Sequence, residues 1–179
     1  MDNPFELFGL TSTFEIDEQS LAVTFRSIQR LVHPDRYAGG SGQERRQAVE
    51  RAAAVNGAYQ ILRDPVRRAR YLLSLRGVET QEEGNTIMDP AFLMEQMELR
   101  EQLGEVPETS DPVNVLAALK ARLQERRTAL LGELGAYLST DTAESLVLAA
   151  ERVRRLRFFD RLIQDATTLE ERYLDVPPQ

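Results

Sequence analysis

Apolar residues recur at helical spacing along most of the chain, and the alternation typical of β-strands is nearly absent. From a candidate N-cap at Asp17, one apolar stripe advances by steps of four, three and four residues through Leu21, Phe25, Ile28 and Val32. Helical side chains advance by about 100° per residue, so these positions share one face of a helix. A proline follows at position 34 and disfavours helical backbone in the residue before it, which predicts that the helix ends there.

A second long helix is expected to begin near Ser41 or Gly42. Its buried stripe comprises Ala48, Ala52, Val55, Tyr59 and Leu62. Gly57 lies inside this helix, where glycine is about 1 kcal/mol less favourable than alanine, and we interpret it as a position of close helix packing. Asp64 and Pro65 then provide a cap and a first residue for a short helix, and Gly77 provides its stop.

The polar stretch 77–88 is weakly patterned, and we place a domain boundary there. Residues 1–76 predict a long antiparallel helix pair with flanking short helices, which is a small but foldable domain. Residues 89–179 form the second predicted domain, and 77–88 form a linker between them. The chain is therefore expected to be all-α.

Three helical patterns occupy the second domain. The first begins near residue 90, and the second begins at Pro112 after a cap at Asp111. The third is expected to open at Asp141, with Glu144 as its capping-box partner, and to run to about residue 173. Long helices joined by short loops are typical of an antiparallel three-helix bundle.

Composition excludes several kinds of site. The chain of 179 residues has no cysteine and one histidine, so disulfides, thiolate metal sites and histidine clusters are excluded. A formal net charge of −7 disfavours nucleic acid as a partner. No apolar run is long enough to span a membrane, and the N-terminus lacks the features of a signal peptide, so we expect a cytoplasmic protein without a metal or cofactor.

The single histidine allows four interpretations: a general base, a metal ligand, a structural residue that ends a helix, or a residue that a partner protein contacts. The segment offers no nucleophile for a base and no second histidine for a metal. His33, Pro34 and Asp35 lie in a loop between two antiparallel helices, and Arg26 and Arg30 fall on the face opposite the apolar stripe. This placement favours contact with a partner over an ordinary solvated helix face.

The same placement resembles the J-domain, with which J-proteins stimulate DnaK-class chaperones. The matching segments are "NPFELFGL", "LAVTFRSIQRLVHPDRY" and "AAAVNGAYQILRDPVRRARYLL". In the second domain, "AFLMEQMELREQL" and "RVRRLRFFDRL" resemble the C-terminal domain of the HscB family, which serves iron–sulfur cluster assembly. The chain lacks the Cys-x-x-C pairs of some eukaryotic relatives, which indicates a bacterial type. The segment "VPETSDPVNV" does not match.

The resemblance implies an L-shaped co-chaperone whose J-domain binds the DnaK-class ATPase HscA. The residues implied to contact it are His33, Pro34, Asp35, Arg26, Arg30 and Arg36. Pro34 would keep the loop rigid, so that less entropy is lost on docking. Asp35 would accept charge-assisted hydrogen bonds, and the arginines would steer association with an acidic surface.

The first helix of the second domain carries two apolar arcs. One arc, Met88, Phe92, Leu99 and Leu103, is sufficient for a core stripe. The other consists of Leu93, Met94 and Met97, and in the last helix Phe158 lies off the apolar stripe. These residues either belong to a wide core, lie under the J-domain, or form an exposed patch that binds a protein.

The resemblance implies that this second arc binds the iron–sulfur scaffold protein IscU. The implied anchors are Leu93, Met94, Met97 and Phe158, with Glu98, Glu101 and Arg157 as a polar rim. The protein would then not be an enzyme. Three alternatives stay open: a general J-protein for unfolded clients, a helical enzyme using Glu95, Glu98 and Glu101, and a helical adaptor unrelated to chaperones.

Overall fold

A computed structural model describes residues 3–33, 35, 39–80 and 89–174, and all regular structure within these ranges is helical. The elements are α1 (Pro4–Leu7), α2 (Glu18–Val32), α3 (Gly42–Arg63), α4 (Pro65–Leu75), α5 (Pro90–Glu105), a 3-10 turn η2 (Val106–Glu108), α6 (Pro112–Thr140) and α7 (Ala143–Leu174). The predicted all-α class is confirmed. Met88, expected in a core stripe, and residues 175–179 of the second predicted domain lie outside the described residues.

Local side chains fix most helix starts where the sequence predicts them. Asp17 accepts hydrogen bonds from the N–H groups of residues 19 and 20, and Ser41 forms a capping box with Glu44. Asp64 caps α4, and Gly77 follows the end of α4 with a φ of +73°, which is a conformation that glycine adopts without strain. These boundaries depend on short-range hydrogen bonds, so the sequence alone is sufficient to predict them.

The start of α7 differs from the prediction by one position. Asp141 is the left-handed C-cap of α6, with a φ of +55°, and does not cap α7. Thr142 takes that role, because its Oγ1 accepts the N–H of Ser145 at 3.2 Å while Ser145 Oγ accepts the N–H of Thr142 at 2.9 Å. The reciprocal pair is therefore Thr142 and Ser145, and the predicted pair of Asp141 and Glu144 is wrong.

Helices α2 and α3 form the predicted antiparallel hairpin, with Leu21, Val55 and Leu62 buried between the helices and their neighbours. Phe25 and Tyr59 stack across the hairpin with ring centroids 3.9 Å apart. Gly57 is exposed and an added Cβ would meet nothing within 4 Å, so the interpretation of Gly57 as a close-packing position is wrong.

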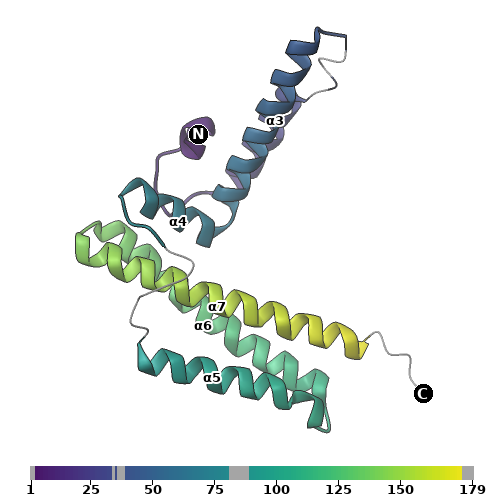
Figure 1. The fold of residues 1–179 in the computed structure, drawn as a ribbon, viewed down its shortest axis with the longest axis vertical. Coiled ribbons are helices and arrows are strands. Elements are labelled where there is room, and N and C mark those ends of the chain that lie inside the picture. Colours follow the sequence, from purple (N-terminus) through teal and green to yellow (C-terminus); the bar gives the residue numbers. More distant parts are fainter. Residues whose placement is uncertain (1–2, 34, 36–38, 81–88, 175–179) are drawn as a thin grey trace.

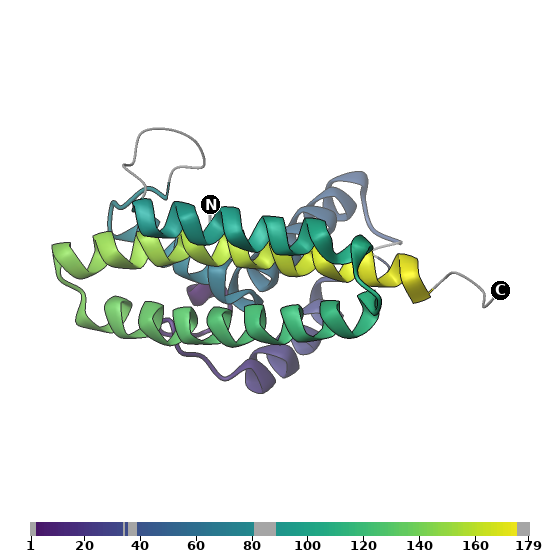
Figure 2. The same cartoon turned by 90° about the horizontal axis from the view of Figure 1, so that it is seen from below.

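The bundle is built on the long antiparallel pair α6 and α7, and α5 runs alongside them (Figures 1 and 2). The buried faces of α6 and α7 carry leucines at helical spacing, together with Val153 and Phe159. Helix α5 contributes only Phe92 and Leu99 to the buried residues, so most of its surface faces away from the bundle.

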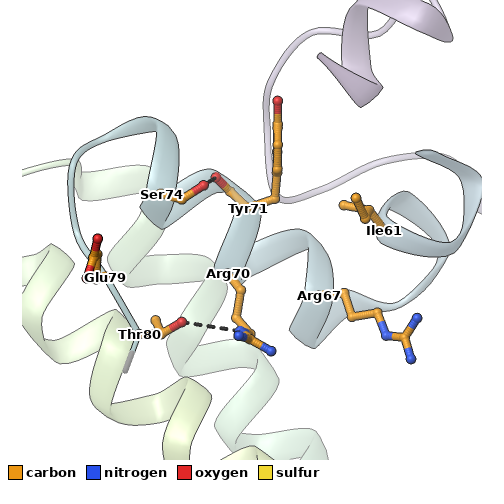
Figure 3. A pocket seen from close by; sticks show the side chains of 7 residues that line it. All are labelled: Ile61, Arg67, Arg70, Tyr71, Ser74, Glu79 and Thr80. Carbon is orange, nitrogen blue, oxygen red and sulfur yellow. Dashed lines mark hydrogen bonds between the residues drawn. The ribbon is translucent and has the colours of Figure 1, made fainter. Parts of the chain in front are cut away.

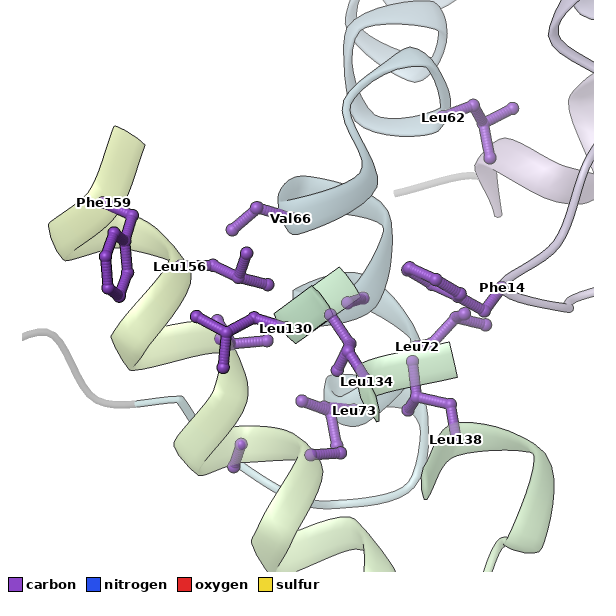
Figure 4. Packing of buried hydrophobic residues seen from close by; sticks show 14 of the residues in the cluster. Phe14, Leu62, Val66, Leu72, Leu73, Leu130, Leu134, Leu138, Leu156 and Phe159 are labelled. Atoms are coloured by element: carbon purple, nitrogen blue, oxygen red, sulfur yellow. The ribbon is translucent and has the colours of Figure 1, made fainter. Parts of the chain in front are cut away.

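The predicted J-domain and the bundle share one core through α4 (Figure 4). Leu72 and Leu73 of α4 belong to the same buried cluster as Leu134 and Leu156 of the bundle. The hairpin projects away from this joint, which gives the L-shaped outline of the molecule (Figure 1). The exact limits of the predicted domains and linker stay a prediction.

A second set of contacts joins the segment before α2 to α6. Phe14 packs against Gly135, where an added Cβ would lie 3.2 Å from the phenyl ring. The guanidinium of the buried Arg68 lies over this ring, 5.2 Å from its centroid, and Arg76 forms an ion pair with Asp141. The placement of the hairpin relative to the bundle is thus set by packed and charged contacts.

Candidate functional site

His33 lies at the tip of the hairpin, where it is the C-cap of α2. Its side chain is 53% exposed and that of Asp35 is 90% exposed. His33 Nδ1 accepts the backbone N–H of Asp35 at 3.3 Å, and it lies 3.6 Å from Asp35 Oδ2. An exposed side chain of this kind is available to a partner.

Arg26 and Arg30 are exposed on the outer face of α2, as their spacing predicts. The Nε of Arg30 donates to the carbonyl oxygen of Arg26 at 3.2 Å. Residues 1–76 contain eleven arginines and nine acidic residues, whereas residues 77–179 contain eleven basic and twenty acidic residues. Residues 1–76 therefore carry a weakly basic balance of charge, and residues 77–179 are strongly acidic. Pro34 and Arg36, the other predicted chaperone contacts, lie outside the described residues.

Leu93, Met94 and Met97 form an exposed apolar strip on α5, which we call the α5 strip. Their exposed fractions are 46%, 63% and 65%, so neither the bundle core nor the J-domain covers them. Glu98 and Glu101 are exposed on the same helix. The interpretations that these three residues belong to a wide core or lie under the J-domain are therefore wrong. Exposed apolar side chains that lie together are typical of a surface that binds a protein.

Phe158 is half-buried and packs against the core. Its position off the apolar stripe of α7 therefore does not leave it fully exposed. Its ring makes edge-to-face contacts with the rings of Phe92 and Phe159, with centroid distances of 5.8 Å and 5.4 Å. The guanidinium of Arg100 lies 5.5 Å from the Phe158 centroid. The sequence alone gives no signal for Arg100, because its position over the ring depends on how α5 and α7 pack. Arg157 is exposed beside Phe158.

The carboxylates of α5 do not converge on a common point. Glu95 is partly buried and pairs with Arg126 of α6 at 3.6 Å, while Glu98 and Glu101 face solvent. Within the described ranges, no group of three or more His, Cys, Asp or Glu residues is placed to hold a metal ion. The helical-enzyme alternative therefore receives no support from this geometry.

A surface hollow of about 630 Å³ lies between α4, the end of α3 and the segment after α4 (Figure 3). Its lining comprises Ile61, Arg67, Arg70, Tyr71, Ser74, Glu79 and Thr80. Arg70 Nε donates to Thr80 Oγ1 at 3.2 Å, and Ser74 Oγ donates to the carbonyl of Tyr71 at 2.7 Å. None of the sequence-predicted site residues lines this hollow.

Among the described helices, none is long and apolar enough to cross a bilayer.

Comparison with known proteins gives consistent matches over nearly the whole chain. Residues 88–167 match the family model described as the HSCB C-terminal oligomerisation domain. A co-chaperone protein HscB homolog of Shewanella sp. (strain MR-4) is 43% identical, covering 97% of this chain and 99% of the relative. The co-chaperone protein HscB of Proteus mirabilis is 42% identical, covering 96% of this chain and 97% of the relative.

Solved structures agree with these sequence matches. The chaperone HscB from Vibrio cholerae superposes with a TM-score of 0.86 at 41% identity, covering 96% of this chain and 99% of that chain. The human co-chaperone protein HscB also gives a TM-score of 0.86, at 26% identity, covering 95% of this chain and 83% of that one.

Proposed function

Because this chain belongs to the HscB family of co-chaperones, we propose that it serves iron–sulfur cluster assembly by delivering the scaffold protein IscU to the DnaK-class chaperone HscA. In this proposal the chain also stimulates the chaperone's ATPase, while carrying no cluster and no catalytic group of its own. The observation that carries the proposal is the exposure of Leu93, Met94 and Met97 on α5, in a molecule that also exposes His33 at the tip of the hairpin.

The proposed chaperone contact is the tip of the hairpin, with His33, Asp35 and the adjoining Pro34. Arg26, Arg30 and Arg36 would complete it. Exposed arginines on a weakly basic domain support attraction to an acidic partner surface, which accelerates encounter. No chemistry is needed from these residues, because a ligand that binds one conformation of the chaperone better than another shifts its population. A shift toward the hydrolysis-competent conformation would raise the ATPase rate.

The proposed scaffold contact is the α5 strip, with Phe158 behind it and Glu98, Glu101 and Arg157 as a charged rim. Methionine side chains adapt to irregular partner surfaces, and each apolar anchor that becomes buried contributes about 1.5–3 kcal/mol. Because Phe158 is half-buried and its ring already packs against Phe92 and Phe159, only its exposed part would be available to the scaffold.

Binding both partners at once would raise their effective concentration for each other. The shared core of α4, α6 and α7 supports this role, because a fixed joint keeps the two binding surfaces on separate arms of the L. A flexible connection would lose part of that advantage through additional conformational entropy.

Two variants test the proposal. The substitution His33→Gln should abolish stimulation of the HscA ATPase in a single-turnover assay and leave IscU binding unchanged. The triple substitution of Leu93, Met94 and Met97 to alanine should weaken IscU binding at least about a hundredfold, roughly 2.7 kcal/mol, and leave the scaffold-independent stimulation unchanged.

A control for the triple variant replaces three other exposed apolar residues of the bundle, Val115, Val147 and Leu174, with alanine. This control should bind IscU like the wild type. Equal weakening by both triple variants would contradict a specific site on α5. Tight binding of the wild type to many unfolded peptides, with no preference for IscU, would instead favour the general J-protein alternative.

A further inference from the structure

Helix α5 carries the proposed scaffold-binding strip but is held to the bundle by few contacts. Of its residues, only Phe92 and Leu99 are buried, and both lie on the inner face of the helix. A helix with little buried area keeps its position through a small number of specific interactions, and local opening is easiest where buried contacts are few. The orientation of the strip therefore depends on the groups that anchor the first turns of α5.

Arg155 of α7 is one of these anchors. Its Nη2 donates to Asp89 Oδ2 at 3.0 Å and also to Glu151 Oε1, and its guanidinium lies 4.7 Å from the centroid of the Phe92 ring. The side chain is only 14% exposed. One planar group thus contacts the residue before α5, the residue just ahead of Leu93, and its own helix.

Asp89 has two roles in this arrangement. Its Oδ1 accepts the N–H of Ala91 at 3.1 Å, which caps the start of α5, while its Oδ2 accepts from Arg155. The same carboxylate therefore starts the helix and fastens it to α7. These two roles can be separated, because asparagine also caps helices well but cannot form an ion pair.

We propose that Arg155 is a positioning residue for the α5 strip: together with Asp89 it fixes the first turns of α5 against α7, so that Leu93, Met94 and Met97 face the scaffold as a preformed surface. The proposal rests on the proposed scaffold-binding function. A surface that is already ordered loses less conformational entropy on binding, so removing the anchor weakens affinity without removing any residue that contacts the scaffold.

The variants are Arg155→Met, Asp89→Asn, the double variant and Arg155→Lys. Methionine retains an apolar stem over Phe92 but loses the charge, whereas lysine keeps an ammonium within reach of Asp89 and Glu151. We expect Arg155→Met and Asp89→Asn each to weaken binding of purified apo-IscU about tenfold, which corresponds to about 1.4 kcal/mol. The double variant should bind no more weakly than the weaker single variant, because both remove the same interaction.

The conservative variant and a local measurement separate positioning from a general loss of stability. Arg155→Lys keeps the positive charge but loses the planar group over Phe92, so it should bind more tightly than Arg155→Met and more weakly than the wild type. Hydrogen exchange should become faster for the amides of residues 92–97 in Arg155→Met and Asp89→Asn, and stay unchanged in α6. The matched control is Arg161→Met, which replaces an exposed arginine of α7 and should change neither the binding of IscU nor the hydrogen exchange of α5.

Each outcome bears on one claim. Wild-type binding in Arg155→Met and Asp89→Asn, or unchanged exchange in α5, would overturn the positioning role. If Arg155→Met does not fold, Asp89→Asn decides alone, because it retains the helix cap. Failure of the wild type itself to bind apo-IscU would refute the proposed function, and the exchange measurement would still decide whether Arg155 anchors α5.

Discussion

Replacing Gly135 with alanine tests the contact between α6 and the segment before α2. Gly135 is buried in the interior of α6, and an added Cβ would lie 3.2 Å from Phe14 Cδ1 and 3.0 Å from Glu15 Oε1. The carboxylate of Glu15 can move, but the Phe14 ring is buried beneath Arg68. The alanine methyl group must therefore displace the ring or the joint that contains it.

Two terms of opposite sign set the magnitude. Alanine is about 0.8–1.0 kcal/mol more favourable than glycine inside a helix. Adding a carbon to a well-packed site costs about 1–3 kcal/mol. Gly132 separates the terms, since it lies one turn earlier in α6 with nothing within 4 Å of an added Cβ. Gly132→Ala should therefore show the helix term alone and stabilise the protein by about 1 kcal/mol.

Urea unfolding of the two variants, followed by circular dichroism, measures the difference. The free energy of unfolding of Gly135→Ala should be about 1–3 kcal/mol lower than that of Gly132→Ala. In thermal unfolding, a difference of 2 kcal/mol corresponds to a Tm lower by about 4–8 °C for a chain of this size. Equal stabilisation by both substitutions would show that Phe14 does not pack tightly against α6, and would refute the description of the joint.

Three further predictions concern helix caps and the aromatic cluster. Thr142→Ala should lower the free energy of unfolding by about 1 kcal/mol, whereas Glu144→Ala should leave it unchanged; the reverse result would restore the cap that the sequence alone predicts. Hydrogen bonds from the first turn of α2 hold the pKa of Asp17 below its ordinary value of 3.8, so its stabilising contribution is present above that pH and is lost as the pH falls through the lowered pKa. The difference in Tm between the wild type and Asp17→Asn should therefore shrink between pH 7 and about pH 2, and a constant difference would contradict this pairing. Phe158→Ala should cost about 2 kcal/mol in urea unfolding and Leu93→Ala less than about 0.5 kcal/mol, while equal costs would show that Phe158 is not packed.

Features that depend on short-range physics are predictable from this sequence. The caps at Asp17, Ser41, Asp64 and Asp111 each involve a side chain and a backbone N–H two or three residues away, so a short sequence pattern contains the whole interaction. The apolar strip on α5 was also predictable, because a bundle helix buries one face and Leu93 lies on another.

Features that depend on packing between distant segments were not predictable. Gly57 and Gly135 are both glycines inside long helices, and only the fold places Phe14 beside one of them. The half-burial of Phe158 and the anchoring role of Arg155 likewise require the register of α5 against α7. Periodicity assigns a face to each residue of a helix but does not say which neighbour lies on that face.

The core that α4 shares with α6 and α7 limits the exchange of parts between proteins of this kind. An isolated domain of α1 to α4 would expose Leu72 and Leu73 to water, and an isolated bundle would expose Leu134 and its neighbours. A chimaera that takes its J-domain from another chaperone system must therefore bring a matching α4 surface. Recombination at residues 77–88 without such a surface would expose apolar side chains at the joint and produce an aggregation-prone protein, even if each domain still recognised its own partner.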